Sequence, residues 1–362
     1  MAILCGIHKG AAMTKLTIKD VATTAGVSIA TVSRVLNDPE RVKPETVALV
    51  QAAIAGLRYR PNVNGRRLKT ATSQAIGVLL PSIGNPVFAD SLAGIEAAAQ
   101  AAGYTLLLTT SSYDPAREDA AIATLLGNRV DGLILTVADA DGSAVVRSLR
   151  CEGVPYVLLY NQPHASDIAS VSVDNAGAAR AITEHLIALG HRRFAMIAGS
   201  FASSDRSRLR WSGVGAALAA VGLPAARLVE TGFSGSDLPD ALTPLLTGPD
   251  RPTALVCSND MLALATMRGC RALGLDVPGD VSVVGFDGIG VGELVQPSLC
   301  TVVQPTREMG RQAIDILLGL IEGRESPRSI LLPHTIREGE STAPPPPAPR
   351  QPAHDREIGR VS

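Results

Sequence analysis

Short apolar runs alternate with helical stretches from residue 75 onward, and this alternation restricts the fold more than any other feature of the chain. The first four runs are AIGVLL (75–80), YTLLLTT (104–110), GLILT (132–136) and YVLLY (156–160). The helical stretches between them lie near 87–102, 116–127 and 142–151. Continuous apolar runs of this length are typical of parallel strands covered by helices on both faces. The sequence therefore predicts a doubly wound α/β sheet.

The same alternation then starts again, which predicts a second sheet. In order, it comprises a helix over 176–189, FAMIAG (194–199), a helix over 206–221, TALVCS (253–258), a helix over 260–273 and VSVVGFD (281–287). Ligands bind such sheets beyond the carboxyl ends of the strands. Two similar halves that face one another therefore predict a ligand cleft between them.

The segment before residue 60 predicts a separate all-α unit. The expected elements are a helix over 18–25 capped by Thr17, a turn at Gly26 and Val27, a helix from Ser28 to near Leu36, and a helix over 44–57. Apolar positions at helical spacing supply a small core. The ones from the first two helices are Val21, Ala22, Val32, Val35 and Leu36.

The first two of these helices predict a helix-turn-helix, although an ordinary helical hairpin would have the same spacing. Small residues and Arg34 occupy the outer face of the second helix, as a helix that enters the major groove of DNA requires. Charge favours DNA as the partner. Residues 1–70 contain eleven Lys and Arg against four Asp and Glu, whereas the rest of the chain carries 22 against 30.

Several segments together resemble the lactose repressor (LacI/GalR) family of bacterial transcription regulators. The first two are TIKDVATTAGVSIATVSRVLND and YRPNVNGRRL. Further matches are IGVLLPSIGNPVFADSLAGIEAAAQAAGY, RVDGLIL, HLIALGHRR, CSNDMLALATMRGCRALGLDVPGDVSVVGFDG and QPTREMGRQAIDILL. The resemblance covers about residues 16–340. It implies a DNA-binding headpiece and a two-lobed core like that of periplasmic sugar-binding proteins.

The resemblance implies which headpiece residues contact DNA. Ile29, Ala30 and Arg34 fall at the base-reading positions, and Arg34 suits a bidentate contact with guanine. Outside DNA recognition, Arg34 would be a solvated helix arginine. The other implied DNA contacts are Thr17, Ser28, Thr31, Ser33, Asn37, Asn62, Arg66 and Leu68.

The segment NVNGRRLKT is similar to the hinge helix of the family, which folds on operator DNA. The resemblance implies that Leu68 inserts into the minor groove as an apolar wedge. Gly65 stands where the family usually has alanine, and glycine costs about 1 kcal/mol in a helix interior. We therefore expect a hinge that depends more strongly on DNA to fold.

The resemblance also implies an effector site in the cleft. The implied contacts are Pro81, Ser82, Phe88, Tyr160, Asn161, Arg210, Asn259, Asp260 and Asp287. Acceptors for hydroxyl groups opposite an arginine suit a polyol. Any one of these residues could instead cap a strand end or form a buried ion pair. Tyr160 and Asn161 replace an aspartate common in the family, and Gly288 replaces a polar residue, so the identity of the effector does not carry over.

These observations predict a domain organisation and an assembly. We expect a disordered extension over 1–15, a headpiece over 16–60, a hinge over 61–70, a core over 71–340 and a disordered proline-rich tail over 341–362. In the core, the first subdomain would cover about 75–173 and 302–329, and the second about 174–301 and 330–340. The expected assembly is a homodimer on a near-palindromic operator, and the sequence leaves open whether two dimers join into a tetramer, since the proline-rich tail has no heptad repeat.

The expected compartment is the bacterial cytoplasm, at the nucleoid. The apolar stretch at the start is too short for a signal peptide, and no apolar run approaches a membrane span of about 18 residues. The five cysteines include no C-x-x-C pair, which favours buried reduced thiols over a disulfide framework or a zinc site.

Two other classes of protein would share the α/β pattern. An exported solute-binding protein should have a signal peptide and no basic helical front. An NAD-dependent enzyme should have a dinucleotide fingerprint, but GVGAAL (213–218) lacks the third glycine and GIGVG (288–292) is only a glycine-rich loop. We therefore expect no enzyme activity, no catalytic residues, no cofactor and no bound metal.

Overall fold

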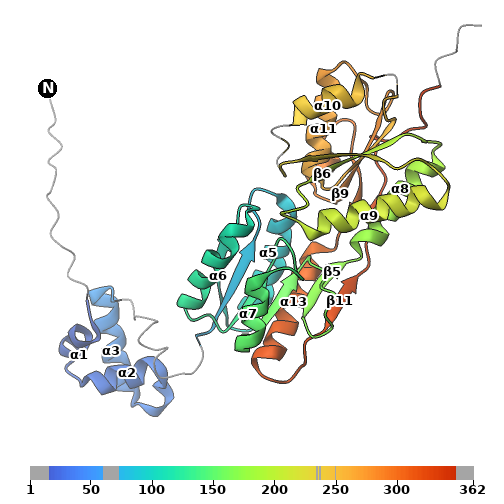
Figure 1. Ribbon diagram of the computed structural model, residues 1–362. Helices are drawn as coiled ribbons and strands as arrows, with labels where there is room; N and C mark the ends of the chain where they lie inside the picture. Colours follow the sequence, from blue (N-terminus) through green and yellow to red (C-terminus); the bar gives the residue numbers. More distant parts are fainter. Residues whose placement is uncertain (1–15, 60–72, 234, 236–237, 249, 348–362) are drawn as a thin grey trace, which may run out of the picture. The chain divides into compact units, whose positions relative to one another are not determined.

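The computed structural model describes residues 16–59, 73–233, 235, 238–248 and 250–347. The chain divides into two compact units, one ending at Ser73 and the other beginning at Gln74 (Figure 1). Each unit has its own hydrophobic core. None of the helices in the described part of the chain combines the length and the apolar character that a membrane span requires.

The first unit contains the three predicted α-helices. They are α1 (Ile18–Ala25), α2 (Ile29–Asn37) and α3 (Pro44–Leu57), with a 3-10 turn, η1 (Pro39–Arg41), between α2 and α3. Gly26 joins α1 to α2 in the left-handed conformation, with φ 65°, which glycine adopts without strain. Four of the predicted core residues, Val21, Ala22, Val32 and Val35, are buried, whereas Leu36 is half-buried.

The second unit has two lobes, each built on a six-stranded sheet, as the sequence predicts (Figure 1). The first sheet has the order β11-β5-β4-β3-β1-β2 and is parallel throughout. Its strands are β1 (Ala75–Leu80), β2 (Thr105–Thr110), β3 (Gly132–Leu135), β4 (Tyr156–Leu159), β5 (Ser170–Val173) and β11 (Ser329–Leu332). The helices of this lobe are α5 (Pro86–Ala101), α6 (Glu118–Gly127), α7 (Ala144–Glu152) and α13 (Thr306–Ile321), with a 3-10 turn, η2 (Pro115–Arg117), before α6.

The second sheet has the order β12-β10-β9-β8-β6-β7, in which only the pairing of β10 with β12 is antiparallel. Its strands are β6 (Phe194–Gly199), β7 (Arg227–Thr231), β8 (Ala254–Cys257), β9 (Ser282–Asp287), β10 (Cys300–Val303) and β12 (Thr335–Arg337). The helices of this lobe are α8 (Asn175–Ala188), α9 (Asp205–Ala220), α10 (Leu238–Leu246), α11 (Asp260–Ala272) and α12 (Val291–Leu294).

Three segments connect the lobes, and two of the crossing points differ from the expected positions. The chain crosses after β5, after β10 and after β11. We expected the second crossing at 302 and the third at 330, but β10 stays in the second sheet through Val303, and β11 pairs with β5 in the first sheet through Leu332. The short run SILL suits either sheet, so its sequence alone did not place the third crossing.

The segment that follows β12 is packed at its beginning, contrary to the expectation of disorder from residue 341. Ser341 is buried, and its hydroxyl donates to the carbonyl of Val283 at 2.6 Å and accepts from the amide of Cys300 at 2.9 Å. The buried His191 ring contacts the carbonyl oxygen of Ala343 at 2.9 Å. Residues 348–362 lie outside the described residues.

The described cysteines are all free, but they are not all buried. Cys257, Cys270 and Cys300 lie in the second lobe and are buried, as expected. Cys151, near the end of α7, is exposed, so the expectation of a buried thiol is wrong there. Cys5 lies outside the described residues.

Glycines allow the helices of each lobe to approach closely. A Cβ atom on Gly94 of α5 would lie 2.1 Å from the carbonyl oxygen of Arg307 in α13. In the second lobe, a Cβ atom on Gly213 of α9 would lie 2.1 Å from the carbonyl oxygen of Ala176 in α8. Because these contacts are with backbone atoms, a larger side chain can be accommodated only if the helices move apart.

We expect Gly213→Ala to lower the free energy of unfolding by about 1–3 kcal/mol, because it forces α8 and α9 apart. Gly215→Ala is a control in the same helix. A Cβ atom there meets nothing within 4 Å, so helix propensity should raise the free energy of unfolding by about 0.5–1 kcal/mol. Denaturant unfolding of the full chain measures both. Equal effects of the two substitutions would contradict the close helix contact.

Candidate functional site

The headpiece presents the start of α2 to solvent. Val32 and Val35 point into its core, whereas Ile29, Ala30 and Arg34 are exposed. Thr31 and Ser33 are half-buried and Asn37 is exposed. Arg34 forms no ion pair with any other described residue. The structure therefore leaves the three implied base-reading side chains free to contact a partner.

Three of the implied DNA contacts also stabilise the ends of the headpiece helices. Ser28 caps α2, since its hydroxyl oxygen accepts from the amide of Thr31 at 3.1 Å. The amide and hydroxyl of Thr17 donate to the Asp20 carboxylate at 2.7 and 2.8 Å, and these bonds lower the pKa of Asp20. The side-chain amide of Asn37 donates to the carbonyl of Ser33 at 2.7 Å.

The implied hinge contacts lie outside the described residues. They are Asn62, Arg66 and Leu68, and Gly65 lies in the same segment. Their roles stay predictions.

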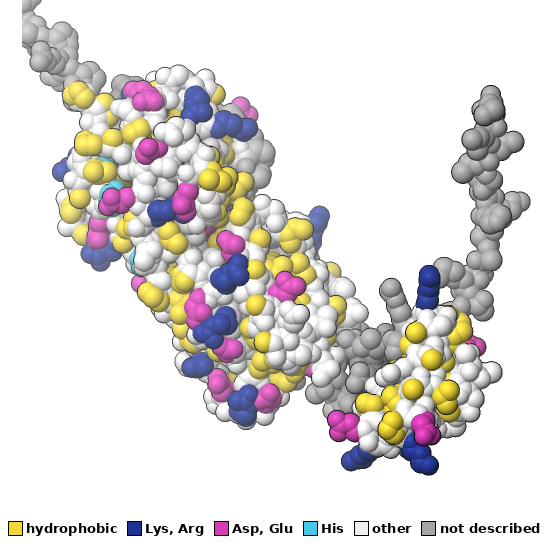
Figure 2. Space-filling view, turned by 180° about the vertical axis from the view of Figure 1, so that it is seen from behind, with side chains coloured by type: hydrophobic (Ala, Val, Ile, Leu, Met, Phe, Trp, Pro, Cys, Tyr) yellow, Lys and Arg dark blue, Asp and Glu magenta, His cyan; other side chains and the backbone are white. Residues whose placement is uncertain are grey.

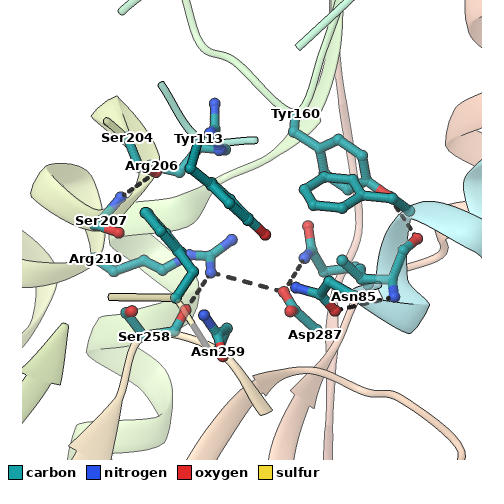
Figure 3. A pocket seen from close by; sticks show the side chains of 14 residues that line it. Asn85, Tyr113, Tyr160, Ser204, Arg206, Ser207, Arg210, Ser258, Asn259 and Asp287 are labelled. Atoms are coloured by element: carbon teal, nitrogen blue, oxygen red, sulfur yellow. Dashed lines mark hydrogen bonds and ion pairs between the residues drawn. The ribbon is translucent and has the colours of Figure 1, made fainter. Parts of the chain in front are cut away.

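A cavity of about 30 Å³ lies between the lobes of the core (Figure 3). From the first lobe and the second crossing, it is lined by Asn85, Val87, Phe88, Tyr113, Tyr160 and Gln304. From the second lobe, it is lined by Ser204, Arg206, Ser207, Arg210, Phe233, Ser258, Asn259 and Asp287. A volume of this size holds about one water molecule.

Five of the nine residues that we expected to contact an effector line this cavity. They are Phe88, Tyr160, Arg210, Asn259 and Asp287. Pro81, Ser82, Asn161 and Asp260 do not line it. Ser82 instead accepts from the amide of Gly84 at 3.0 Å, in the turn before α5, and Pro81 is buried at the end of β1.

Arg210 is the central charged group of the cavity wall. Its guanidinium lies 3.5 Å from the centre of the Phe286 ring, and its Nη1 lies 3.7 Å from Oδ1 of Asp287. Its Nε donates to Oδ1 of Asn175 at 2.8 Å, and its Nη1 donates to the carbonyl of Ser258. Burial lowers the pKa of Arg210 to about 10, so the side chain stays charged at neutral pH. The contacts with Asn175, Ser258 and Phe286 fix the orientation of its side chain.

Asp287 ends β9 and faces Arg210 in the cavity (Figure 3). Its Oδ1 accepts from the side-chain amide of Gln304 at 2.9 Å. Burial raises the pKa of Asp287 to about 7, although the charge of Arg210 lowers it. Asp287 also has a positive φ of 129°, a backbone conformation that is rare outside glycine. Its carboxyl group can therefore accept from, or when protonated donate to, a ligand hydroxyl.

Asp260 holds the loop that directly follows Asp287, and it does not line the cavity. One carboxylate oxygen accepts from the amides of Gly288 and Ile289, both at 2.8 Å, and the other accepts from the Thr301 hydroxyl at 2.5 Å. The side chain is fully buried, and burial raises its pKa. We interpret Asp260 as a positioning residue.

The start of α9 connects the lobes beside the cavity. The Asp205 amide donates to the carbonyl of Ala138 at 2.7 Å, and its carboxylate accepts from the amide of Ala140 at 3.1 Å. Nη1 of Arg206 donates to the carbonyl of Val137 at 2.9 Å. Asn161 belongs to this contact, since its side-chain amide donates to Asp205 at 2.8 Å. These bonds join the loop after β3 to α9.

Sequence reasoning missed several residues that line the cavity. Asn85 and Ser204 cap the N-termini of α5 and α9, the helices that follow β1 and β6. Helix-capping signals in the sequence could therefore have placed both residues near the carboxyl ends of these strands. Tyr113 and Phe233 follow β2 and β7 without a motif. The remaining ones are Val87, Arg206, Ser207, Ser258 and Gln304. Among the described residues, no group of three or more His, Cys, Asp or Glu side chains could hold a metal ion.

Both units match known protein families. Residues 17–62 match the family described as bacterial regulatory proteins, lacI family, and residues 73–339 match periplasmic binding proteins and sugar binding domain of LacI family. The chain belongs to the LacI family of bacterial regulatory proteins. As a member of this family, it is a transcriptional regulator.

Curated relatives and solved structures are similar to this chain along most of its length. Catabolite control protein A of Priestia megaterium is 33% identical over 330 residues, which covers 90% of this chain and 99% of the relative. The lac repressor dimer bound to operator and an anti-inducer has a TM-score of 0.80 at 31% identity, covering 91% of this chain and all of that one. The regulator CelR in complex with cellobiose has a TM-score of 0.68 at 29% identity, covering 90% and 99%.

A buried carboxylate beside this site predicts a pH dependence of stability. Glu118 begins α6, its Oε1 accepts from the amide of Ala138 at 2.7 Å, and burial raises its pKa to about 7. The folded protein therefore holds the proton more tightly than the unfolded chain. Consequently, the free energy of unfolding should fall as pH rises from about 4.5 to about 7.

We expect Glu118→Gln to remove part of this fall and to stabilise the protein by roughly 2–3 kcal/mol at pH 8, with little change at pH 4.5. Denaturant unfolding across this pH range measures it. Part of the fall should remain in this variant, because the pKa of Asp287 is also raised to about 7. Glu184→Gln, on the exposed face of α8, is the control. A pH profile of Glu118→Gln that coincides with that of the control would contradict the role of Glu118.

Proposed function

We propose that this LacI-family regulator represses transcription by binding a near-palindromic operator as a homodimer, and that a sugar or related metabolite in the interlobe cleft changes its affinity for DNA. It would act in the bacterial cytoplasm, at the nucleoid, where operator DNA is found. The observation that carries the proposal is the joining, in one chain, of an exposed recognition helix to a two-lobed core with a polar cavity.

The exposed face of α2 supports the DNA-binding part. Ile29 and Ala30 are small enough for the helix to approach base edges closely, and Arg34 can reach further. Ser28 and Thr31 lie at the helix N-terminus, where hydroxyls and backbone amides suit phosphate oxygens. The similar lac repressor was solved bound to operator DNA, which also supports DNA as the partner of this chain.

The cavity supports a polyol or sugar as effector. Arg210 and Arg206 are donors, whereas Asp287 and the serines at 204, 207 and 258 can accept or donate. Aromatic side chains supply apolar walls. A known relative carries cellobiose, which agrees with this class of ligand. The ligand would change DNA affinity by binding two arrangements of the lobes unequally.

The first lobe also offers a surface for a second copy of the chain. Ala93, Ala97 and Ala101 of α5 lie beside a charged row of α13 that carries both signs. That row contains Arg307, Glu308, Arg311 and Asp315. A row with both signs can pair with itself across a two-fold axis. On the face of the core in Figure 2, charges of both signs also lie among hydrophobic side chains.

A substitution that keeps the charge of Arg34 tests base recognition. Arg34→Lys removes the bidentate fork, so we expect the ratio of operator to random-duplex affinity to fall about 10- to 100-fold. The salt dependence of binding should stay unchanged. The measurement is a gel shift with salt titration, on duplexes selected from a random library.

Arg180→Lys, exposed on α8, is the matched control. Equal loss of affinity for operator and random duplex would assign Arg34 to phosphate contact alone. If selection enriches no sequence for the unaltered chain, the proposed function is wrong.

Asp287→Asn tests the effector site with little change in shape. The Asn oxygen can still accept from Gln304, but the charge opposite Arg210 is lost. We expect operator affinity without sugar to be unchanged. The sugar concentration for half-maximal response should rise about tenfold, as for loss of a charged hydrogen bond.

The assay titrates ribose, glucose, gluconate and cellobiose into the operator complex. Asp250→Asn, at an exposed site in the same lobe, is the control and should behave as the unaltered chain does. An unchanged response of Asp287→Asn to an active sugar would contradict a ligand contact at this residue.

A further inference from the structure

Aromatic side chains gather around the cavity far more than the composition suggests. The chain has only five Phe, five Tyr and one Trp. Four of these eleven line the cavity: Phe88, Tyr113, Tyr160 and Phe233. The Phe88 ring meets the Tyr160 ring edge-on, with 5.4 Å between ring centres, and lies tilted to the Tyr113 ring, with 6.3 Å between ring centres. Phe88 and Tyr160 are buried and belong to the hydrophobic core, whereas Tyr113 and Phe233 are half-buried, so the latter pair is the part of this group that a ligand could reach.

Tyr113 and Phe233 stack across the cleft. Tyr113 follows β2 in the first lobe and Phe233 follows β7 in the second, and their ring centres lie 3.9 Å apart with an interplanar angle of 5°. Both side chains are half-buried. The stack therefore lies where the cavity meets solvent, and each lobe contributes one ring.

The Tyr113 hydroxyl reaches the polar wall of the cavity. Figure 3 shows it pointing toward the region between Arg210, Asn85 and Asp287. Burial raises the pKa of the Tyr113 hydroxyl to about 12, although a hydrogen bond with the Asn85 side chain and the nearby arginines lower it. The phenol thus stays protonated, and its hydroxyl lies among the polar groups that line the cavity.

The backbone holds this ring in position at a cost. Ser112 and Tyr113 are consecutive non-glycine residues with left-handed φ values of 56° and 59°. Each such residue costs on the order of 1 kcal/mol. The turn is closed by the amide of Asp114, which donates to the carbonyl of Ser111 at 3.1 Å. The orientation of Tyr113 therefore comes from the fold and opposes local preference.

With Tyr113 in place, the cavity of about 30 Å³ has no room for a sugar ring. We propose that Tyr113 occupies the ligand position in the unliganded cleft, and that the effector is a hydroxylated ring that displaces it and stacks one flat face on Phe233. This inference rests on the proposed function of the cleft as the effector site. It favours a cyclic sugar over an open-chain sugar acid or alditol, because an open chain offers no flat face to Phe233.

The test removes the Tyr113 ring by substitution and then adds a small molecule that resembles the tyrosine side chain. Tyr113→Gly suits the left-handed backbone and removes the ring. The probe is p-cresol, the side-chain analogue of tyrosine, added to the full chain and followed by thermal unfolding. At about ten times its Kd, it should raise the Tm of Tyr113→Gly by about 2–4 °C. Its Kd should be at least about tenfold lower than for the unaltered chain, whose site is filled.

Two further probes test the shape and the hydroxyl of the site. Toluene, which lacks the hydroxyl, should bind Tyr113→Gly more weakly than p-cresol, and 1-hexanol, which lacks the ring, more weakly still. In Tyr113→Gly/Phe233→Ala, the rescue by p-cresol should be lost. Tyr104→Ala, which removes a half-buried tyrosine elsewhere in the first lobe, is the matched control and should show no saturable rescue.

Each contrary result overturns the inference. Equal stabilisation of the unaltered chain by p-cresol would show that Tyr113 does not occupy the site. If p-cresol does not stabilise Tyr113→Gly, the proposed ring-binding position is wrong. If 1-hexanol binds Tyr113→Gly as tightly as p-cresol does, the proposed preference for a ring is wrong. The readout is unfolding without DNA or sugar. A failure of operator binding, which would refute the proposed function, is therefore distinguishable from a failure here.

Discussion

The bonds between the start of α9 and the loop after β3 set the geometry on which the cavity depends. Asp205 and Arg206 bond to backbone atoms of the first lobe, and Arg206, Ser207 and Arg210 of the same helix line the cavity. Residues four apart lie on one face of a helix, so Arg206 and Arg210 are held in register. A change in the distance between the lobes therefore moves the cavity wall, and a ligand that moves the wall shifts the lobes.

The buried charges around this contact act by positioning. Removing charges from water is costly, and such groups seldom add stability over apolar residues of the same shape. Asp260 instead uses both carboxylate oxygens to hold Gly288, Ile289 and Thr301, and thereby fixes the loop that directly follows Asp287. Asn161 likewise joins Asp205 to the first lobe. Both residues were expected to contact an effector, and in the structure both instead hold residues of the cleft in place.

The parts of the fold that could be predicted are those with continuous apolar runs. AIGVLL became β1 because a strand covered on both faces must be apolar throughout. The strand β5, with the sequence SVSV, was not located, because its serines are buried through hydrogen bonds such as that from Ser172 to the carbonyl of Tyr160. The exposed edge strand β7 lacks an apolar run altogether. In the cavity, Arg210 and Asp287 follow from family motifs, whereas Tyr113 and Phe233 come together only through the tertiary fold.

A filled cavity gives the effector a basis for acting on DNA. A ligand shifts an equilibrium only by its differential affinity for the two states, and in this arrangement of the lobes Tyr113 leaves about 30 Å³. The present state therefore binds a ring poorly, and an arrangement with Tyr113 displaced binds it well. A difference of about 1–3 kcal/mol suffices for a 5- to 150-fold change in operator affinity. Because β1 begins at Ala75, directly after the boundary between the units, the strand nearest the headpiece in the chain belongs to the lobe that carries Tyr113.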